Sequence, residues 1–158
     1  NIIDPFTGED WPVLRPLTPD VSVVQVQTAD KDGNAWILGP RWDNTEQVRA
    51  SQRTILIAES IVSGEAIRQN PERTMIPGLF VSHVVELPFA AHPTSVYKAY
   101  DYDAAHIQVY VEATRTQESF QEYLEQYVYG VQDHWEYLER IGGLRNLKNL
   151  QADPILGY

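Results

Sequence analysis

The feature that most constrains the fold is a continuous apolar run, Thr54-Ile-Leu-Ile-Ala58, which has the length of a buried strand. Such a strand must be covered on both faces, as in the parallel sheets of α/β proteins. A β-branched segment at residues 20–27 predicts an earlier strand. Between the two, residues 43–46 supply helix N-cap side chains and predict a helix over about 45–52. This order predicts an α/β layer with at least partly parallel strands.

Further elements follow from turn residues and spacing. Asp-Gly-Asn at residues 32–34 indicates a tight turn, so residues 35–38 are predicted to form a short strand paired with the first. Residues 60–69 are predicted to be a short helix that ends at Asn70-Pro71, and residues 82–87 another strand.

The C-terminal part of the chain has a helical pattern. Asp103 can cap one helix, and from Thr116 to Ile141 apolar residues recur at helical spacing beside an acidic face. The predicted fold is therefore α/β, with an open, mostly parallel sheet flanked by helices and a long C-terminal helical region. Its predicted parts are a Pro-rich loop at 1–20, an α/β core at 21–100, a helical region at 103–141 and a tail at 142–158.

Composition excludes several classes of protein. The 158 residues have a formal net charge of -10, which is the wrong sign for binding a nucleic acid or an anionic membrane. No apolar stretch approaches the roughly 20 residues that cross a bilayer. The absence of cysteine excludes disulfides and thiolate metal sites. We expect a cytoplasmic globular protein with neither nucleic acid nor membrane as a partner.

The loop between Phe89 and Asp103 is the segment richest in groups that could contact a substrate. Pro93 follows His92 and stiffens the loop, and Ser95 and Tyr97 bring hydroxyl groups close by. We predict that His92, Ser95 and Tyr97 bind substrate.

Arg41 is a fourth substrate-binding candidate, because it is the one cation in a turn that could face a ligand. Aromatic stacking by Trp36 or Trp42 explains that turn equally well.

Other titratable residues have structural explanations. His83 alternates within a predicted strand, and His106 and His134 lie near helix starts, where we expect exposure. Glu59 follows the buried run, where α/β sheets place catalytic groups; a carboxylate that accepts backbone N–H groups of the next helix is the other interpretation. Asp101 and Asp103 match no calcium loop, and capping is the better explanation.

Motifs for autonomous catalysis do not occur. The sequence has no Gly-x-Gly-x-x-Gly, no Walker lysine, no Gly-x-Ser-x-Gly and no His-Glu-x-x-His. We therefore predict no catalytic residue and no metal ligand in this chain.

Several segments resemble one family in the same order along the chain. Residues 20–35, followed by Gly39, are similar to the Asp-x-x-Gly-Asn segment of A subunits in the family I CoA transferases. Further segments resemble elements of the glutaconate type; they are residues 57–62, 73–81, 84–95 and 122–142.

The resemblance implies a C-terminal half of an A-type (alpha) subunit in a heteromeric acyl-CoA:carboxylate CoA-transferase. In this family the acyl-CoA is attacked by a Glu of the B-type subunit, which forms a thioester intermediate, and a Gly-rich loop early in the A subunit forms an oxyanion hole. The implied partners are that B-type subunit, the missing N-terminal half, and acyl-CoA and carboxylate substrates. Coenzyme A enters as a thioester substrate, and no covalently bound cofactor is expected.

Two other interpretations stay open. The same architecture serves hydrolases that open a steroid ring on a CoA thioester, and it also serves a decarboxylase. A non-catalytic interaction domain that kept the fold is the second class.

Overall fold

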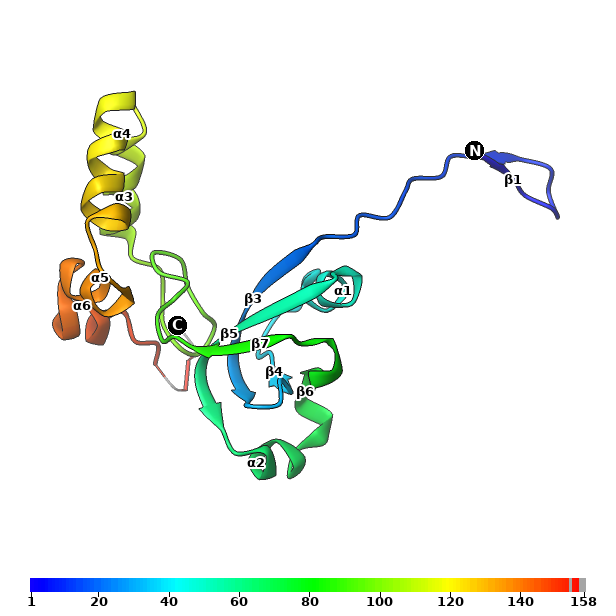
Figure 1. Ribbon diagram of the computed structural model, residues 1–158, viewed down its shortest axis with the longest axis horizontal. Coiled ribbons are helices and arrows are strands. Elements are labelled where there is room, and N and C mark those ends of the chain that lie inside the picture. The colour runs from blue at the N-terminus through cyan, green and yellow to red at the C-terminus, as the bar shows by residue number, and fades with distance from the viewer. Residues whose placement is uncertain (154, 157–158) are drawn as a thin grey trace.

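The computed structural model describes residues 1–153 and 155–156 of the chain. Its centre is a five-stranded sheet (Figure 1). The strands are β3 (Val21–Asp30), β4 (Ala35–Trp36), β5 (Arg53–Val62), β6 (Thr74–Ile76) and β7 (His83–Glu86).

The sheet has the order β6-β4-β3-β5-β7. Strands β3, β5 and β7 run parallel, with Val21 opposite Arg53 and Ile55 opposite His83. Strands β4 and β6 are antiparallel to their neighbours. The α/β class is confirmed, and the sheet is mostly parallel as predicted, with β4 running against the direction shared by β6, β3, β5 and β7. The turn at Gly33, with φ of 87°, reverses β3 into β4 and creates the antiparallel side.

The core lies on one face of this sheet. Alternate residues of β3 and β5 point into it and are almost fully buried, including Val24, Val26 and Leu56. Val48 of helix α1 (Asn44–Ala50) packs on these strands. On the opposite face, Val21 and Val23 stay half exposed.

The short helix predicted at residues 60–69 begins later than expected. Strand β5 continues to Val62, because residues 60–62 pair with residues 28–30 of β3. Helix α2 (Gly64–Arg68) then starts after Ser63, whose side chain caps it. Two single turns of 3-10 helix, η1 (Pro71–Arg73) and η2 (Gly78–Phe80), flank β6.

The C-terminal region gathers on one side of the sheet as several helices (Figure 1). The prediction that Asp103 caps a helix is confirmed, because its side chain accepts the N–H of His106 at the start of α3 (Ala104–Ala113). The helical stripe from 116 to 141 is divided into α4 (Gln117–Leu124), a π-helical turn η3 (Glu125–Tyr129) and α5 (His134–Arg140). The division falls at Gly130, after which Asp133 caps α5.

The tail contains a helix that the sequence interpretation missed, α6 (Gly143–Leu150). Residues 154, 157 and 158 of the predicted tail lie outside the described residues.

The N-terminal segment is extended, as its prolines predict. It carries a small hairpin of β1 (Ile2–Ile3) and β2 (Asp10–Trp11), which lies away from the central sheet (Figure 1). Across the described residues, none of the helices combines the length and the apolar character needed to cross a membrane.

Candidate functional site

The loop at residues 88–102 follows β7 and is fixed to the sheet near the carboxyl ends of the parallel strands. Gln27, on the face of β3 opposite the core, donates from Nε2 to the carbonyl oxygens of Tyr97 (3.1 Å) and Leu38 (3.3 Å). Its Oε1 accepts the N–H of Leu38 at 3.0 Å. The loop therefore lies where open α/β sheets usually place their binding sites.

Glu59 of β5 holds the beginning of this loop. Its carboxylate accepts the N–H of Phe89 at 2.8 Å and the side-chain amide of Gln25 at 2.6 Å. Burial raises the pKa of Glu59, and these two hydrogen bonds oppose the rise. The carboxylate thus accepts a backbone N–H, but from the loop after β7 rather than from the next helix.

Tyr100 packs at the centre of the loop. It is 2% exposed, its ring stacks on Phe89 with 4.6 Å between centroids, and its hydroxyl oxygen accepts the N–H of Ala91 at 2.9 Å. Burial raises the pKa of Tyr100, so it stays neutral at physiological pH. Glu59 and Tyr100 together hold the beginning of the loop, at Phe89 and Ala91.

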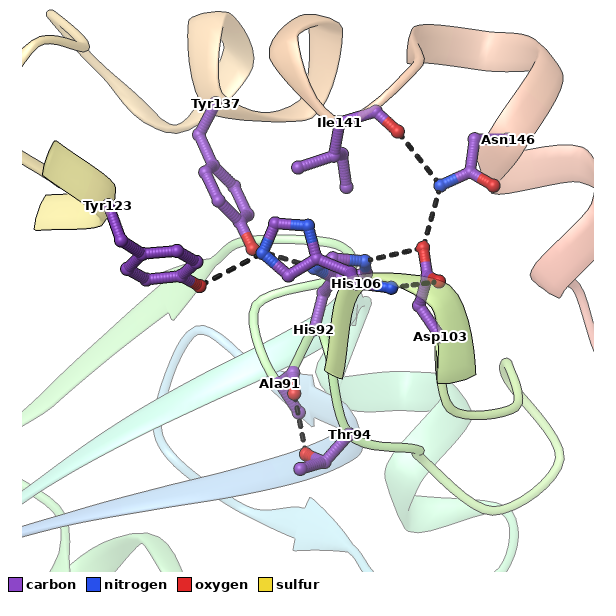
Figure 2. Close-up of polar contacts among 9 residues, drawn as sticks. All are labelled: Ala91, His92, Thr94, Asp103, His106, Tyr123, Tyr137, Ile141 and Asn146. Atoms are coloured by element: carbon purple, nitrogen blue, oxygen red, sulfur yellow. Dashed lines mark hydrogen bonds and ion pairs between the residues drawn. The ribbon is translucent and has the colours of Figure 1, made fainter. Parts of the chain in front are cut away.

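His92 joins the loop to the helices (Figure 2). Its Nε2 lies 3.2 Å from Oδ2 of Asp103, and its Nδ1 lies 2.6 Å from the hydroxyl of Tyr137 on α5. Because a carboxylate only accepts hydrogen bonds, we assign the proton to Nε2, and Tyr137 then donates to Nδ1. Burial lowers the pKa of His92, despite the opposing effect of Asp103.

Asp103 is the centre of this network. Burial opposes its ionisation, but hydrogen bonds from Asn146, the N–H of His106 and His92 hold the pKa of Asp103 at about 2. The carboxylate is therefore ionised at neutral pH and binds α3, α6 and the loop to one another (Figure 2).

His106 is buried, which contradicts the expected exposure near a helix start. Its Nε2 lies 2.9 Å from the hydroxyl of Tyr123, and the rings of His92 and Tyr127 pack edge-on against it. Burial lowers its pKa. His134 is half-buried, and its Nε2 lies 2.7 Å from the carbonyl oxygen of Pro88. His83, by contrast, lies exposed on edge strand β7.

The four predicted substrate-binding residues have different surroundings. Both ring nitrogens of His92 are engaged inside the protein, whereas Ser95 and Tyr97 are exposed. Tyr97 lies over Gly39, where an added Cβ would meet its ring at 2.5 Å. Arg41, in the same turn, is exposed and contacts Sδ of Met75 at 2.6 Å. The structure thus brings Tyr97 to the turn of Arg41, while His92 points toward the helices.

A cleft of about 830 Å³ separates the loop from the segment after α6, and we call it the loop–tail cleft. The sequence drew attention to Glu59, but it did not predict that Lys98, Tyr100, Lys148 and Gln151 would line a cleft with it. Their separation along the chain hides this site, and only the unrecognised helix α6 brings Lys148 to it.

Comparison with known proteins shows the family. The sequence profile of the Coenzyme A transferase family matches residues 2–87, and the chain belongs to this family. An uncharacterised protein of Archaeoglobus fulgidus is 45% identical over 150 residues, which are 95% of this chain and 34% of that protein. The A subunit of glutaconate CoA-transferase from Acidaminococcus fermentans is 37% identical over 158 residues, covering 99% of this chain and 49% of that protein.

The fold agrees with this relationship. The crystal structure of glutaconate coenzyme A-transferase from Acidaminococcus fermentans matches with a TM-score of 0.91 and 36% identity, over 99% of this chain and 50% of that chain. The resemblance to the glutaconate type is confirmed. The chain spans half or less of the length of these curated relatives.

Proposed function

We propose that this chain is the C-terminal half of the A-type subunit of a heteromeric, glutaconate-type acyl-CoA:carboxylate CoA-transferase. The observation that carries the proposal is the match to glutaconate coenzyme A-transferase over 99% of the chain, at 36% identity and a TM-score of 0.91. A likeness this extensive favours the transferase over the steroid-ring hydrolase and the non-catalytic domain.

The uncovered face of the sheet supports a further polypeptide in the complete protein. Val21 and Val23 of β3 are 50% and 55% exposed, and Val85 of β7 is 42% exposed. Parallel strands are normally covered on both faces, so these residues fit an interface with the missing N-terminal half. The hairpin arm supports the same assembly, because Ile3 and Phe6 are 72% and 95% exposed.

In the proposed reaction, the acyl-CoA carbonyl is attacked by a glutamate that a B-type partner provides, and CoA leaves as thiolate. This attack leaves an acyl-glutamyl anhydride; the thiolate then attacks its glutamyl carbonyl, which forms the glutamyl-CoA thioester and releases the first carboxylate. The second carboxylate attacks this thioester to give a new anhydride and thiolate, and attack of the thiolate on the acyl carbonyl gives the new acyl-CoA and frees the glutamate. Coenzyme A is a substrate throughout. This chain contributes a rigid loop at the sheet edge, and the complete protein is proposed to work in the cytoplasm.

Ser95, Tyr97 and Arg41 stay our proposed substrate contacts. Ser95 and Tyr97 are exposed on the loop, and Tyr97 lies against the turn that carries Arg41. His92 acts in this proposal by holding the loop through Asp103 and Tyr137.

The test uses the purified protein with every polypeptide that co-purifies, incubated with glutaconyl-CoA and acetate. Transfer produces acetyl-CoA, which mass spectrometry of the thioesters detects. Release of CoA without formation of acetyl-CoA would indicate a hydrolase instead of a transferase. Unchanged glutaconyl-CoA in an assembled complex would contradict both proposed activities. Ser95→Ala and Tyr97→Phe should lower the rate of transfer, whereas Tyr129→Phe, on the distant η3 turn, should not.

A further inference from the structure

The side chain of Gln27 joins the two segments that carry the proposed substrate contacts. One segment is the turn after β4, at residues 38–41, which ends at Arg41; the other is the loop at residues 88–102, which contains Tyr97. Gln27 lies on β3 and is half-buried. Among the hydrogen bonds of the described residues, those of Gln27 are the ones that connect these two segments.

Gln27 takes the place of a strand partner for Leu38. Strand β4 ends at Trp36, so the backbone of Leu38 lies beyond the paired residues of β3 and β4. The amide of Gln27 satisfies both of its polar groups, because Oε1 accepts the N–H at 3.0 Å and Nε2 donates to the carbonyl oxygen at 3.3 Å. The start of the turn is therefore fixed to β3 by a side chain that both accepts and donates.

The same amide reaches the loop. Because Nε2 carries two N–H groups, it also donates to the carbonyl oxygen of Tyr97, at 3.1 Å. Lys98 follows with φ of 65°, so the loop turns directly after this contact. The ring of Tyr97 lies so close to Gly39 that an added Cβ there would be 2.5 Å from it. One amide thus holds the loop and the turn at a distance at which the Tyr97 ring packs on glycine.

The neighbouring Gln25 holds a different part of the loop. It lies two residues earlier on β3 and donates to Glu59 at 2.6 Å, and Glu59 accepts the N–H of Phe89. Loss of the Gln27 amide should therefore leave the beginning of the loop in place and release the part around Tyr97. The sheet should stay folded, because the core side chains of β3 lie on its other face.

We propose that Gln27 is a positioning residue of the transferase, which holds Tyr97 against the turn of Arg41 in the arrangement that binds substrate. The inference rests on the proposed function, because Tyr97 and Arg41 are its proposed substrate contacts. Gln27 acts through the backbone of Leu38 and Tyr97 and does not itself touch the substrate. Such positioning has a large effect on rate, since a misplacement of roughly 1 Å can slow a reaction about hundredfold.

The test measures kcat and KM for CoA transfer from glutaconyl-CoA to acetate, with the purified protein and its companion polypeptides. Gln27→Met keeps the length of the side chain and removes its three hydrogen bonds, so we expect kcat/KM to fall by about tenfold or more. Gln27→Glu keeps the acceptor for the Leu38 N–H but removes both donated bonds, and we expect a similar fall. Gln52→Met is the control and should leave both constants unchanged, because Gln52 is exposed at the amino end of β5, opposite the loop.

A double-mutant cycle separates positioning from a general loss of stability. In a Tyr97→Ala background, Gln27→Met should change kcat/KM by less than about twofold, because no ring remains to be held in place. An equal fall in both backgrounds would overturn the proposal. Kinetics of Gln27→Met that match those of the unsubstituted protein would also overturn it.

Amide hydrogen exchange tests the same contact without activity. Exchange at Leu38 should accelerate in Gln27→Met and stay slow in Gln27→Glu, while exchange at Phe89 stays unchanged in both variants. Unchanged exchange at Leu38 in Gln27→Met would contradict the role of the amide. Absence of acetyl-CoA with the unsubstituted protein would contradict the transferase function itself, whereas normal transfer that survives Gln27→Met would contradict only the positioning role.

Discussion

The hydroxyl of Tyr137 lies 2.6 Å from Nδ1 of His92, and this contact joins helix α5 to the loop 45 residues earlier in the sequence. The opposite side of the same ring contacts Asp103, which caps α3 and accepts a hydrogen bond from Asn146 of α6. One imidazole therefore connects the α/β core to three helices. The arrangement of the C-terminal region relative to the sheet depends on this small buried network.

Removing the Tyr137 hydroxyl tests that dependence. Tyr137→Phe should lower the free energy of unfolding by about 1–2 kcal/mol, because the substitution leaves Nδ1 of His92 without its donor. Urea denaturation followed by circular dichroism measures the change. Tyr129→Phe is the control, since Tyr129 is 65% exposed and its change should lie within ~0.5 kcal/mol of zero. If Tyr137→Phe were as stable as the control variant, the contact between Tyr137 and His92 would not stabilise the fold.

Acid should weaken the same network in two stages. Burial lowers the folded-state pKa of His92 and His106 below 6.5, so the unfolded chain binds more protons as pH falls through that value, and stability is lost. Asp103 has a folded pKa of about 2 against 3.8 unfolded, so its contribution is present above 3.8 and is lost between 3.8 and 2.

Urea denaturation at pH values from 7.5 to 4 should show decreasing stability below about pH 6.5. His106→Gln should flatten this dependence, whereas His83→Gln, on an exposed edge strand, should keep it. A stability that rises on acidification from 7.5 to 5.5 would refute the assignment of neutral, buried imidazoles.

Substitution of Glu59 should destabilise the loop at residues 88–102 more than it destabilises the sheet. Glu59→Ala removes the acceptor of the Phe89 N–H and of the Gln25 amide, and we expect a loss of about 1–3 kcal/mol. Hydrogen exchange should accelerate at Phe89 and Ala91 while the β3 amides stay protected. Glu72→Ala is the control variant, because it removes a carboxylate at an exposed position in η1. Unchanged exchange at Phe89 would contradict the role of Glu59 in fixing the loop.

The sequence could predict the core because its signals are local. Burial of β5 is predicted directly by the apolar run at residues 54–58, and burial of β3 by the alternation that begins at residue 20. Asp103 caps its helix through a hydrogen bond from the N–H of His106, three residues later. The break after η3 also had a local signal, since Gly130 is followed by the N-cap Asp133. Continuous apolar spacing across that break concealed it.

The site was less predictable, because its residues meet only through tertiary contacts. His106 packs against Tyr123 of α4 and Tyr127 of η3, and no sequence pattern around residue 106 predicts these partners. Lys98 and Lys148 are fifty positions apart and line the same cleft only once α6 folds back to the loop. The loop was recognised from its composition, but the direction of His92 depended on Asp103 and Tyr137.

Gly39 and Tyr97 should be energetically coupled. Gly39 has φ of 84°, and a Cβ there would lie 2.5 Å from Cδ1 of Tyr97. Gly39→Ala should therefore lower the free energy of unfolding by the roughly 1–2 kcal/mol that a left-handed L-residue costs. Displacement of the Tyr97 ring should lower it further.

In a Tyr97→Ala background, Gly39→Ala should lower the free energy of unfolding only by the cost of the left-handed backbone. A double-mutant cycle of urea denaturations therefore isolates the contact between the two residues. We expect a coupling of about 1 kcal/mol or more, as for other residues in direct contact. The transfer assay on the same variants connects the contact to function, because a displaced Tyr97 would no longer lie beside the Arg41 turn. Additive free energies would mean that the ring moves aside freely, and Tyr97 would then be a poor choice for holding an acyl group in place.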